Sequence, residues 1–166
     1  MKILMVCLGN ICRSPMAEGI MKSRAWQVGL DWVVDSAGTE SYHVGEPPHP
    51  FAVRTAARHG VDISGLRARK FIREDFRNFD KIYAMATDVY GEIRDIAAAE
   101  DPMEKVQLFL EELYPGRIRS VPDPYYGPEK KFREVYDLLD RACLQILSKY
   151  SGLPVFSFPQ HPQKKP

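Results

Sequence analysis

Four short apolar segments alternate with amphipathic segments along this chain, and this alternation limits the possible folds more than any other feature. The apolar segments are residues 2–6, 32–35, 81–85 and 106–110, each long enough for one buried strand. The intervening and following segments predict helices at about 15–26, at 51–59, at 87–99 and from about residue 128. Strands that alternate with helices predict a single α/β domain in which helices cover both faces of a parallel sheet.

Glycine and proline mark the ends of several predicted elements. Pro15 suits the start of a helix, because its fixed φ is helical and its missing N–H is not needed there. Gly60 suits the C-terminal end of the helix at 51–59. Residues 36–50, rich in glycine and proline, predict a loop. Residues 151–166 predict a proline-rich C-terminal tail that follows a domain of residues 1–150.

Charge and hydropathy exclude several classes of protein. The chain has 23 basic and 22 acidic residues, whereas nucleic-acid-binding domains carry a clear basic excess. No apolar run is long enough to cross a bilayer, and the apolar start is too short for a signal peptide. We therefore expect a cytoplasmic protein without a nucleic-acid or membrane partner. Its three cysteines, an odd number, indicate thiol chemistry or packing and not a disulfide framework.

The residues after the first predicted strand have the composition of an anion-binding loop. Cys7 is followed by Leu-Gly-Asn-Ile-Cys and then by Arg13 and Ser14, where the first helix is about to begin. In parallel α/β sheets, ligands bind at the carboxyl ends of strands, where helix N-termini present free N–H groups and a positive dipole. A helix N-terminus and a nearby cation also favour the thiolate form of a cysteine. The segment therefore predicts a nucleophile, Cys7, within an anion site.

The other loop residues are predicted to help bind a tetrahedral oxyanion. Arg13 can donate two hydrogen bonds from its planar guanidinium, and Ser14 can donate one to the thiolate. Backbone N–H groups of residues 8–13 would line the rest, because Gly9 and Asn10 tolerate the positive φ that such a loop needs. The Gly-Lys-Ser/Thr ending of a nucleotide-binding P-loop is absent, so the loop implies neither a nucleotide nor another cofactor.

A second segment, Asp123-Pro124-Tyr125-Tyr126, supplies a candidate acid. Departure of an alcohol from a phosphate ester needs a proton donor, and an aspartate on a proline-stiffened loop can reach a site from the side. By itself, an Asp-Pro pair indicates only a turn. The Cys-x5-Arg loop makes the role of Asp123 as an acid the preferred interpretation.

The chain resembles the low-molecular-weight protein tyrosine phosphatases in three segments, VCLGNICRSP, DSAGT and DPYYG, which occur in that order. The resemblance covers about residues 2–150. It implies a four-stranded parallel sheet with helices on both faces and a phosphate-binding loop between the first strand and the first helix. It further implies hydrolysis of phosphotyrosine and aryl phosphates, with tyrosine-phosphorylated proteins as partners.

A two-step mechanism follows from the same resemblance. Cys7 would attack the phosphorus and form a phosphocysteine, while Asp123 protonates the leaving phenolate. Water would then hydrolyse the intermediate, with Asp123 as the base. Arg13 and the loop amides would hold the equatorial oxygens through both steps, without a metal ion.

The resemblance also assigns residues around the substrate. Asn10 would brace the loop with support from Ser36, and an aromatic slot would enclose the phenyl ring. The implied substrate-binding residues are the loop residues Leu8, Gly9, Asn10, Ile11 and Cys12 together with Tyr42 and Tyr125.

Two departures from the family pattern concern this bracing. Where the family often has histidine in a segment like GHRAR, this chain has Leu66, which cannot supply a hydrogen bond to the loop asparagine. The family's Met-Asp after the third strand appears here as Met85-Ala86. We therefore expect Asn10 to be braced differently or the loop to be looser.

Three other activities could use a loop of this kind: phosphoarginine hydrolysis, arsenate reduction and thiol-based sensing. Arginine-phosphate phosphatases carry threonine at the position of Ile11, and thioredoxin-linked arsenate reductases need two mid-chain cysteines, whereas none lies between Cys12 and Cys143. A thiol sensor would hold phosphate or respond to oxidants with little turnover. The presence of both Asp123 and Ser14 favours turnover.

The remaining cysteines and histidines have separate interpretations. Cys12 either forms a disulfide with an oxidised Cys7 or packs beneath the loop, and Cys143 has the spacing of a core residue. The four histidines lack ligand-like spacing, so we expect no metal site. We expect a monomer or a weak homodimer.

Overall fold

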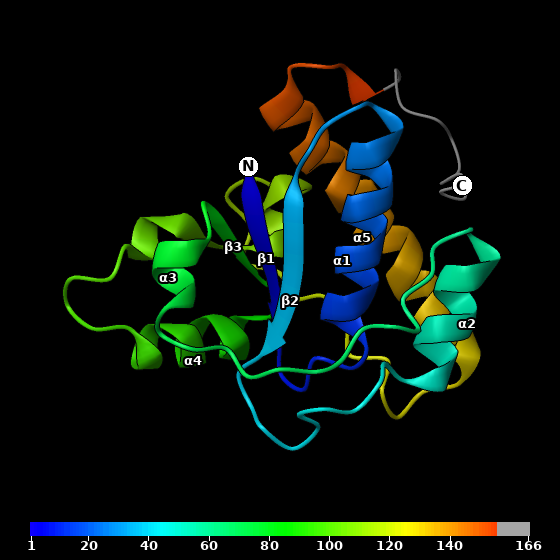
Figure 1. Ribbon diagram of the computed structural model, residues 1–166, viewed down its shortest axis with the longest axis horizontal. Helices are drawn as coiled ribbons and strands as arrows, with labels where there is room; N and C mark the ends of the chain where they lie inside the picture. Colours follow the sequence, from blue (N-terminus) through cyan, green and yellow to red (C-terminus); the bar gives the residue numbers. More distant parts are fainter. Residues whose placement is uncertain (156–166) are drawn as a thin grey trace.

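A four-stranded parallel sheet forms the centre of the protein, as the computed structural model shows for residues 1–155 (Figure 1). The strands lie in the order β2-β1-β3-β4. Every neighbouring pair is parallel, so the predicted sheet is confirmed. Residues 156–166, most of the predicted tail, lie outside the described residues. The strands are β1 (Lys2–Cys7), β2 (Val33–Gly38), β3 (Lys81–Ala84) and β4 (Val106–Leu108).

Helices cover both faces of this sheet (Figure 1). In β1, Ile3 and Met5 face the core shared with α1, α2 and α5, whereas Leu4 and Val6 face the core shared with α3 and α4. This alternation explains why the central strand is apolar throughout, because a strand buried on both faces has no solvent side. The helices are α1 (Arg13–Gln27), α2 (Pro50–Arg58), α3 (Asp75–Asn78), α4 (Thr87–Ile96) and α5 (Glu129–Ser151), with 3-10 turns η1 (Met103–Lys105) and η2 (Phe109–Glu112).

The second strand is longer than predicted, and its extension matters for the site. Residues 36–38 were predicted as part of a loop, but they continue β2. They do so because β2 pairs with β1 along its whole length, as far as the pair of Cys7 with Gly38. A Cβ at Gly38 would lie 2.7 Å from the Leu8 carbonyl oxygen, so glycine allows this close approach. The extension places Ser36 beside the end of β1.

Other boundaries differ from the predictions for local reasons. Helix α1 begins at Arg13, two residues before Pro15, which still lies in the first turn, where amides have no helical partner. Helix α4 ends at Ile96 and not at residue 99, since the Asp101 carboxylate accepts a hydrogen bond from the Ala98 amide and competes with the helix. The apolar run 106–110 leaves the sheet after Leu108 and continues as a 3-10 turn.

Smaller differences concern the remaining elements. Strand β3 ends one residue earlier than predicted, and α2 spans 50–58 instead of 51–59. Helix α3 was not predicted, because one turn is too short to show an apolar period. Helix α5 begins where the periodicity predicts. Within residues 1–155, no helix has the length and apolar character that crossing a bilayer requires.

A buried ion pair joins the two longest helices behind the sheet. Arg24 of α1, whose side chain is fully buried, donates from Nε and Nη2 to the two carboxylate oxygens of Asp140 in α5, at 2.9 and 2.6 Å. A bidentate pair of this kind fixes orientation as well as distance. It therefore sets how α5 packs on α1, whose N-terminus follows the loop that was predicted to bind an anion.

Removal of the Asp140 carboxylate should destabilise the protein. We expect Asp140→Ala to lower the free energy of unfolding by about 3–5 kcal/mol, because it removes a carboxylate that accepts two hydrogen bonds from the buried Arg24 guanidinium. Urea unfolding measures the change. Asp137→Ala, at an exposed position of the same helix, is the matched control and should change little. The double variant Arg24→Met/Asp140→Leu should recover most of the loss, and equal losses in all three variants would contradict this role.

Candidate active site

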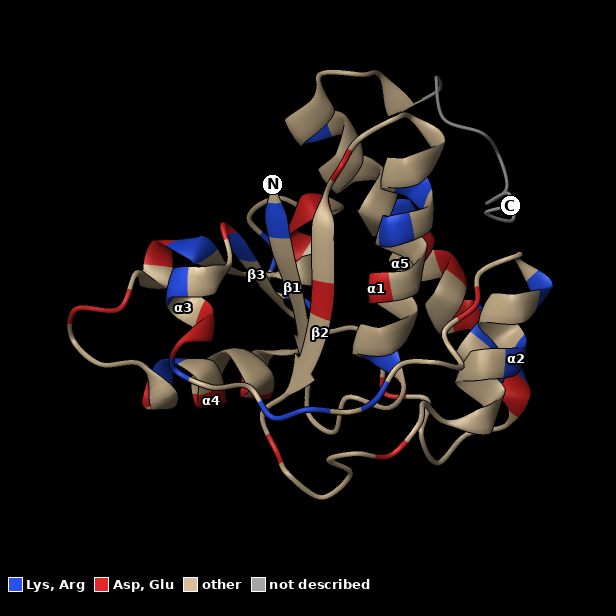
Figure 2. Cartoon of the chain, in the orientation of Figure 1, with Lys and Arg blue, Asp and Glu red and all other residues tan. Residues whose placement is uncertain are grey.

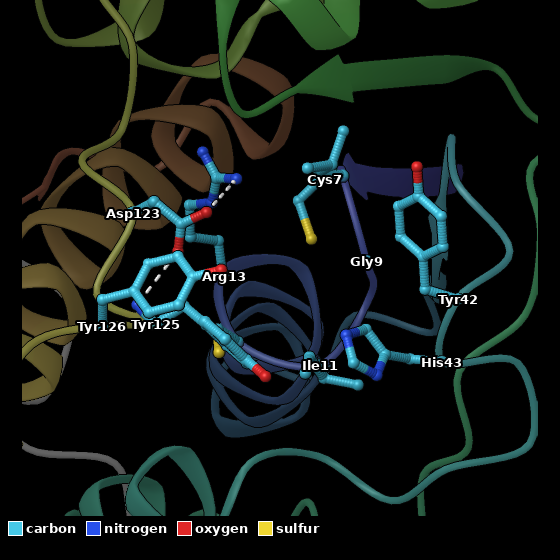
Figure 3. A pocket seen from close by; sticks show the side chains of 11 residues that line it. Cys7, Gly9, Ile11, Arg13, Tyr42, His43, Asp123, Tyr125 and Tyr126 are labelled. Carbon is cyan, nitrogen blue, oxygen red and sulfur yellow. Dashed lines mark hydrogen bonds and ion pairs between the residues drawn. The ribbon is translucent and has the colours of Figure 1, made fainter.

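A pocket of about 280 Å³ opens at the edge of the sheet where the parallel strands end (Figure 3). Three segments distant in sequence meet there: the loop between β1 and α1, the loop after β2, and the segment after η2. The predicted nucleophile, phosphate anchor and acid all line this pocket. Its residues are Cys7, Leu8, Gly9, Ile11, Cys12, Arg13, Tyr42, His43, Asp123, Tyr125 and Tyr126.

The loop between β1 and α1 is held from outside through its backbone carbonyls. The carbonyl oxygens of Cys7, Leu8 and Ile11 accept hydrogen bonds from backbone amides of residues 39, 40 and 49, at 3.0, 2.9 and 2.8 Å. Asn10 adopts φ of +56°, as predicted for a loop of this shape. A loop whose carbonyls bond outward turns amides inward, and the Asn10 amide donates to Cys7 Sγ at 3.3 Å.

The Cys7 thiol is buried at the end of β1 beside the start of α1. Its Sγ lies 3.0 Å from Ser14 Oγ. Asn10 Nδ2 donates to Ser14 Oγ at 2.9 Å, so the Ser14 hydroxyl has two acceptors for its own hydrogen, the sulfur and the Ala37 carbonyl oxygen at 3.5 Å. The sulfur is the nearer of the two.

A continuous chain of polar groups runs from this thiol into the interior. Asn10 Nδ2 also donates to Ser36 Oγ at 2.8 Å, and the Ser36 hydroxyl donates to a carboxylate oxygen of Glu18. Glu18 is itself buried and pairs with Lys22 one helical turn later. Because a carboxylate only accepts, the Ser36 hydroxyl donates to Glu18, and Ser36 Oγ is left to accept from Asn10.

Asn10 is braced by a group that the sequence did not indicate. Its side-chain oxygen accepts from the backbone amide of Arg69 at 2.9 Å. The Arg69 guanidinium is in turn held by Asp35 of β2 and Asp75 of α3, at 2.8 and 3.0 Å. Leu66 packs against the core. The sequence predicted either a different brace for Asn10 or a looser loop, and the structure shows a different brace.

Arg13 and Asp123 form an ion pair on one side of the pocket (Figure 3). Arg13 Nη2 donates to Asp123 Oδ2 at 2.9 Å, and Nη1 donates to the Val121 carbonyl at 3.2 Å. Only 6% of the Arg13 side chain is exposed, whereas the Asp123 side chain is 47% exposed. The Tyr125 amide donates to Asp123 Oδ1 at 3.1 Å, which fixes the carboxylate in its loop.

Aromatic side chains form the rim on opposite sides of Cys7 (Figure 3). Tyr42 and His43 lie on one side, and Tyr125 and Tyr126 lie on the other. Tyr42 and Tyr125 were predicted here, whereas His43 and Tyr126 were not given a place in the pocket. Their adjacency to predicted wall residues is the only signal in the sequence that could have indicated them.

The other two cysteines differ in position. Cys12 is buried and lines the same pocket as Cys7, and burial together with the neighbouring Cys7 raises the pKa of its thiol well above the usual range. Cys143 is fully buried in the core beside α1, where burial also raises its pKa. The prediction that Cys143 is a core residue is confirmed.

Acidic and basic residues are interspersed along the helices and loops (Figure 2). One basic segment, residues 67–70, passes below the end of β2 (Figure 2). There the backbone of Lys70 forms an isolated parallel β-bridge with Gly38. Among residues 1–155, no group of three or more His, Cys, Asp or Glu side chains is placed to hold a metal ion.

Loss of the Ser36 hydroxyl should weaken the buried chain of hydrogen bonds. We expect Ser36→Ala to lower the free energy of unfolding by about 1–3 kcal/mol, since Asn10 and Glu18 each lose a buried partner. Urea unfolding tests this expectation. Ser64→Ala, which removes a hydroxyl bonded to Asp62 at the surface, should have little effect. Equal effects in the two variants would show that the chain contributes no stability of its own.

The sequence and the fold were compared with those of known proteins. Residues 2–151 match the family model described as low molecular weight phosphotyrosine protein phosphatase. A low molecular weight protein-tyrosine-phosphatase of Bacillus subtilis, YfkJ, is 37% identical over 148 residues, which are 88% of this chain and 93% of that protein. The low molecular weight phosphotyrosine protein phosphatase of Homo sapiens is 35% identical over 89% of this chain and 94% of its own.

Solved structures agree with these matches. A protein tyrosine phosphatase from Entamoeba histolytica superposes with a TM-score of 0.83 at 38% identity, over 92% of this chain and 98% of that one. The crystal structure of YfkJ gives a TM-score of 0.84 at 36% identity, over 92% and 95% of the two chains. The chain therefore belongs to the low molecular weight phosphotyrosine protein phosphatase family.

Proposed function

We propose that this protein hydrolyses phosphotyrosine in proteins and small aryl phosphates through a phosphocysteine on Cys7. The observation that carries the proposal is the convergence of Cys7, Arg13 and Asp123 on one pocket with aromatic walls. A thiol supplies the nucleophile, a guanidinium fixes the phosphoryl oxygens, and a carboxyl group supplies the proton. Membership of the family supports the same reaction.

In the first step, the Cys7 thiolate attacks the phosphorus in line with the departing phenolate oxygen. Arg13 and the inward amides of the loop hold the equatorial oxygens, where negative charge is spread in the transition state. As the P–O bond breaks, Asp123 gives its proton to the phenolate. The products are a phosphocysteine, a phenol and an ionised Asp123.

In the second step, a water molecule attacks the phosphocysteine, and Asp123 accepts a proton from it. The P–S bond breaks and the thiolate leaves with its charge stabilised by the Ser14 hydroxyl, which lies 3.0 Å from the sulfur. Because the same carboxyl group gives and then regains a proton, the enzyme returns to its starting state with release of phosphate.

The ion pair between Arg13 and Asp123 links substrate binding to the position of the acid. Arg13 Nη2 donates to Asp123 Oδ2 at 2.9 Å. A phosphate monoester that binds Arg13 competes for the same Nη2 donor. Binding of a substrate therefore releases the Asp123 carboxyl group from Arg13 and leaves it free to contact the departing oxygen.

The pocket walls support an aryl substrate. Leu8 and Ile11 supply apolar contacts between the loop and the rim, and Tyr42 and Tyr125 flank the opening. A phenyl ring can pack between such side chains. The partners that we propose are tyrosine-phosphorylated proteins. We further propose that the protein acts in the cytoplasm as a monomer or weak homodimer, because a thiolate nucleophile requires a compartment that keeps cysteines reduced.

Substitutions at Cys7 and Asp123 test the mechanism. We expect Cys7→Ser to abolish measurable hydrolysis of p-nitrophenyl phosphate and of a phosphotyrosine peptide. Asp123→Asn should lower kcat by roughly 10²- to 10⁴-fold for phenyl phosphate, and by less for p-nitrophenyl phosphate, whose phenolate leaves without a proton. Steady-state kinetics measure both effects.

Asp31→Asn is the matched control, because it removes one exposed carboxylate outside the pocket. It should retain wild-type kinetics. Retained activity in Cys7→Ser, or an equal loss for both esters in Asp123→Asn, would contradict the assigned roles. Faster hydrolysis of phosphoarginine than of phosphotyrosine by the wild type would overturn the substrate class.

We also propose that Cys12 protects Cys7 from irreversible oxidation. Peroxide would convert the Cys7 thiolate to a sulfenic acid, and attack by the Cys12 thiol would form a disulfide with loss of water. Both thiols line the same pocket, five residues apart in the sequence, which supports this reaction.

Peroxide treatment tests this reaction. We expect mass spectrometry to show a linked Cys7–Cys12 peptide and dithiothreitol to restore activity. Cys12→Ser should be inactivated by the same dose with little recovery, whereas Cys143→Ser should behave as the wild type. Full recovery in Cys12→Ser would remove Cys12 from this role.

A further inference from the structure

His49 lies where the loop between β1 and α1 meets α2, although it does not line the pocket. Its backbone amide donates to the Ile11 carbonyl at 2.8 Å. Its side-chain Nδ1 accepts from the Phe51 amide at 3.1 Å and so caps the N-terminus of α2. One residue is therefore tied both to the loop that carries Cys7 and to a helix of the outer layer.

The ring of His49 makes a second set of contacts. It stacks on Phe132 of α5, with centroids 4.9 Å apart and planes at 23°. It also meets the Tyr125 ring edge-on, with centroids 5.8 Å apart and planes at 71°. Geometries of this kind are favourable for aromatic pairs. His49 thus connects Tyr125, a wall of the pocket, to the buried face of α5.

The other ring contacts of Tyr125 provide weaker support. Tyr126 packs edge-on at 4.8 Å but is 96% exposed, so it is not itself held by the core. His43 lies 6.1 Å away on the opposite side of the pocket. By contrast, Phe132 is fully buried, and His49 rests on it. Of these contacts, the one with His49 leads from Tyr125 to a rigid part of the fold.

The charge state of His49 is consistent with both sets of contacts. Burial, together with the positive charge of Arg54, lowers the pKa of His49, so the ring is neutral near pH 7. A neutral ring leaves Nδ1 free to accept the hydrogen bond from Phe51. Arg54 is itself paired with Glu129 of α5 at 3.1 Å.

We propose that His49 is a positioning residue that holds Tyr125 in place as the aromatic wall for the substrate ring. The proposal rests on the proposed phosphatase function and deepens it, because it names a residue outside the pocket that sets affinity for aryl groups. A bound phosphoryl group contacts the loop alone, whereas a bound ring also contacts the wall. Loss of the His49 ring should therefore weaken binding of aryl ligands and spare binding of inorganic phosphate.

Two substitutions separate the ring contact from the helix cap. His49→Asn retains a side-chain acceptor at the N-cap and removes the ring. His49→Phe retains a ring that can stack on Phe132 and removes the acceptor. We expect His49→Asn to raise KM for a phosphotyrosine peptide roughly two- to tenfold, with inhibition by inorganic phosphate unchanged. His49→Phe should keep KM near the wild-type value and lower Tm.

The opposite results would overturn the proposal. If His49→Asn left KM unchanged, or raised the inhibition constant of phosphate in parallel with KM, the ring would not act through the wall. A rise in KM in His49→Phe equal to that in His49→Asn would also contradict the proposal, because His49→Phe keeps a ring that can stack on Phe132. In a Tyr125→Leu background, His49→Asn should add no further change in KM, and an undiminished effect there would also contradict the role.

A binding measurement keeps this test independent of turnover. The affinity for phenylphosphonate relative to inorganic phosphate reports the wall without hydrolysis, and His49→Asn should lower that ratio roughly two- to tenfold. A wild type that binds both ligands but hydrolyses no ester would contradict the proposed function and leave the His49 proposal standing. An unchanged ratio in an active enzyme would contradict the His49 proposal alone.

Discussion

The side chain of Asn10 is the point on which the geometry of the pocket depends. Its backbone has positive φ, which costs an L-residue free energy unless the surrounding structure compensates. Its amide supplies that compensation, because it accepts from Arg69 and donates to Ser14 and Ser36. These bonds fix the turn in the loop, and the turn fixes how the loop amides and Arg13 face a bound phosphate.

A buried charged residue supports the side chain of Asn10 from the interior of the protein. Glu18 is a carboxylate in the interior, and burial of an ion is favourable only when it is paired and hydrogen-bonded. Lys22 supplies the counter-charge and Ser36 the hydrogen bond. Because the carboxylate cannot donate, the hydroxyl of Ser36 must point to it. Cys7 therefore lies at one end of a chain of polar groups whose other end is a buried anion.

The main residues that line the pocket were predictable from the sequence, whereas the contacts that support them were not. Cys7, Arg13 and Ser14 lie within one short loop, so their proximity is local. Asp123 was predicted from its Asp-Pro segment once the Cys-x5-Arg loop had indicated an anion site. The Arg69 amide, 59 positions from Asn10, and the ring of His49 act through contacts that only the folded chain creates. The extension of β2 was missed for the same reason, since pairing with β1 overrides the loop-forming composition of residues 36–38.

Leu66 stands where the resemblance to the family led us to expect histidine, and the loop is nevertheless supported. Asn10 here accepts from a backbone amide, and no substitution other than proline removes a backbone N–H. The position of that amide is set by ion pairs of the Arg69 side chain with β2 and α3. Position 66 is then free to be apolar and to pack against the core. The rigidity of the loop thus depends on the placement of one peptide group, which is determined by the fold around it.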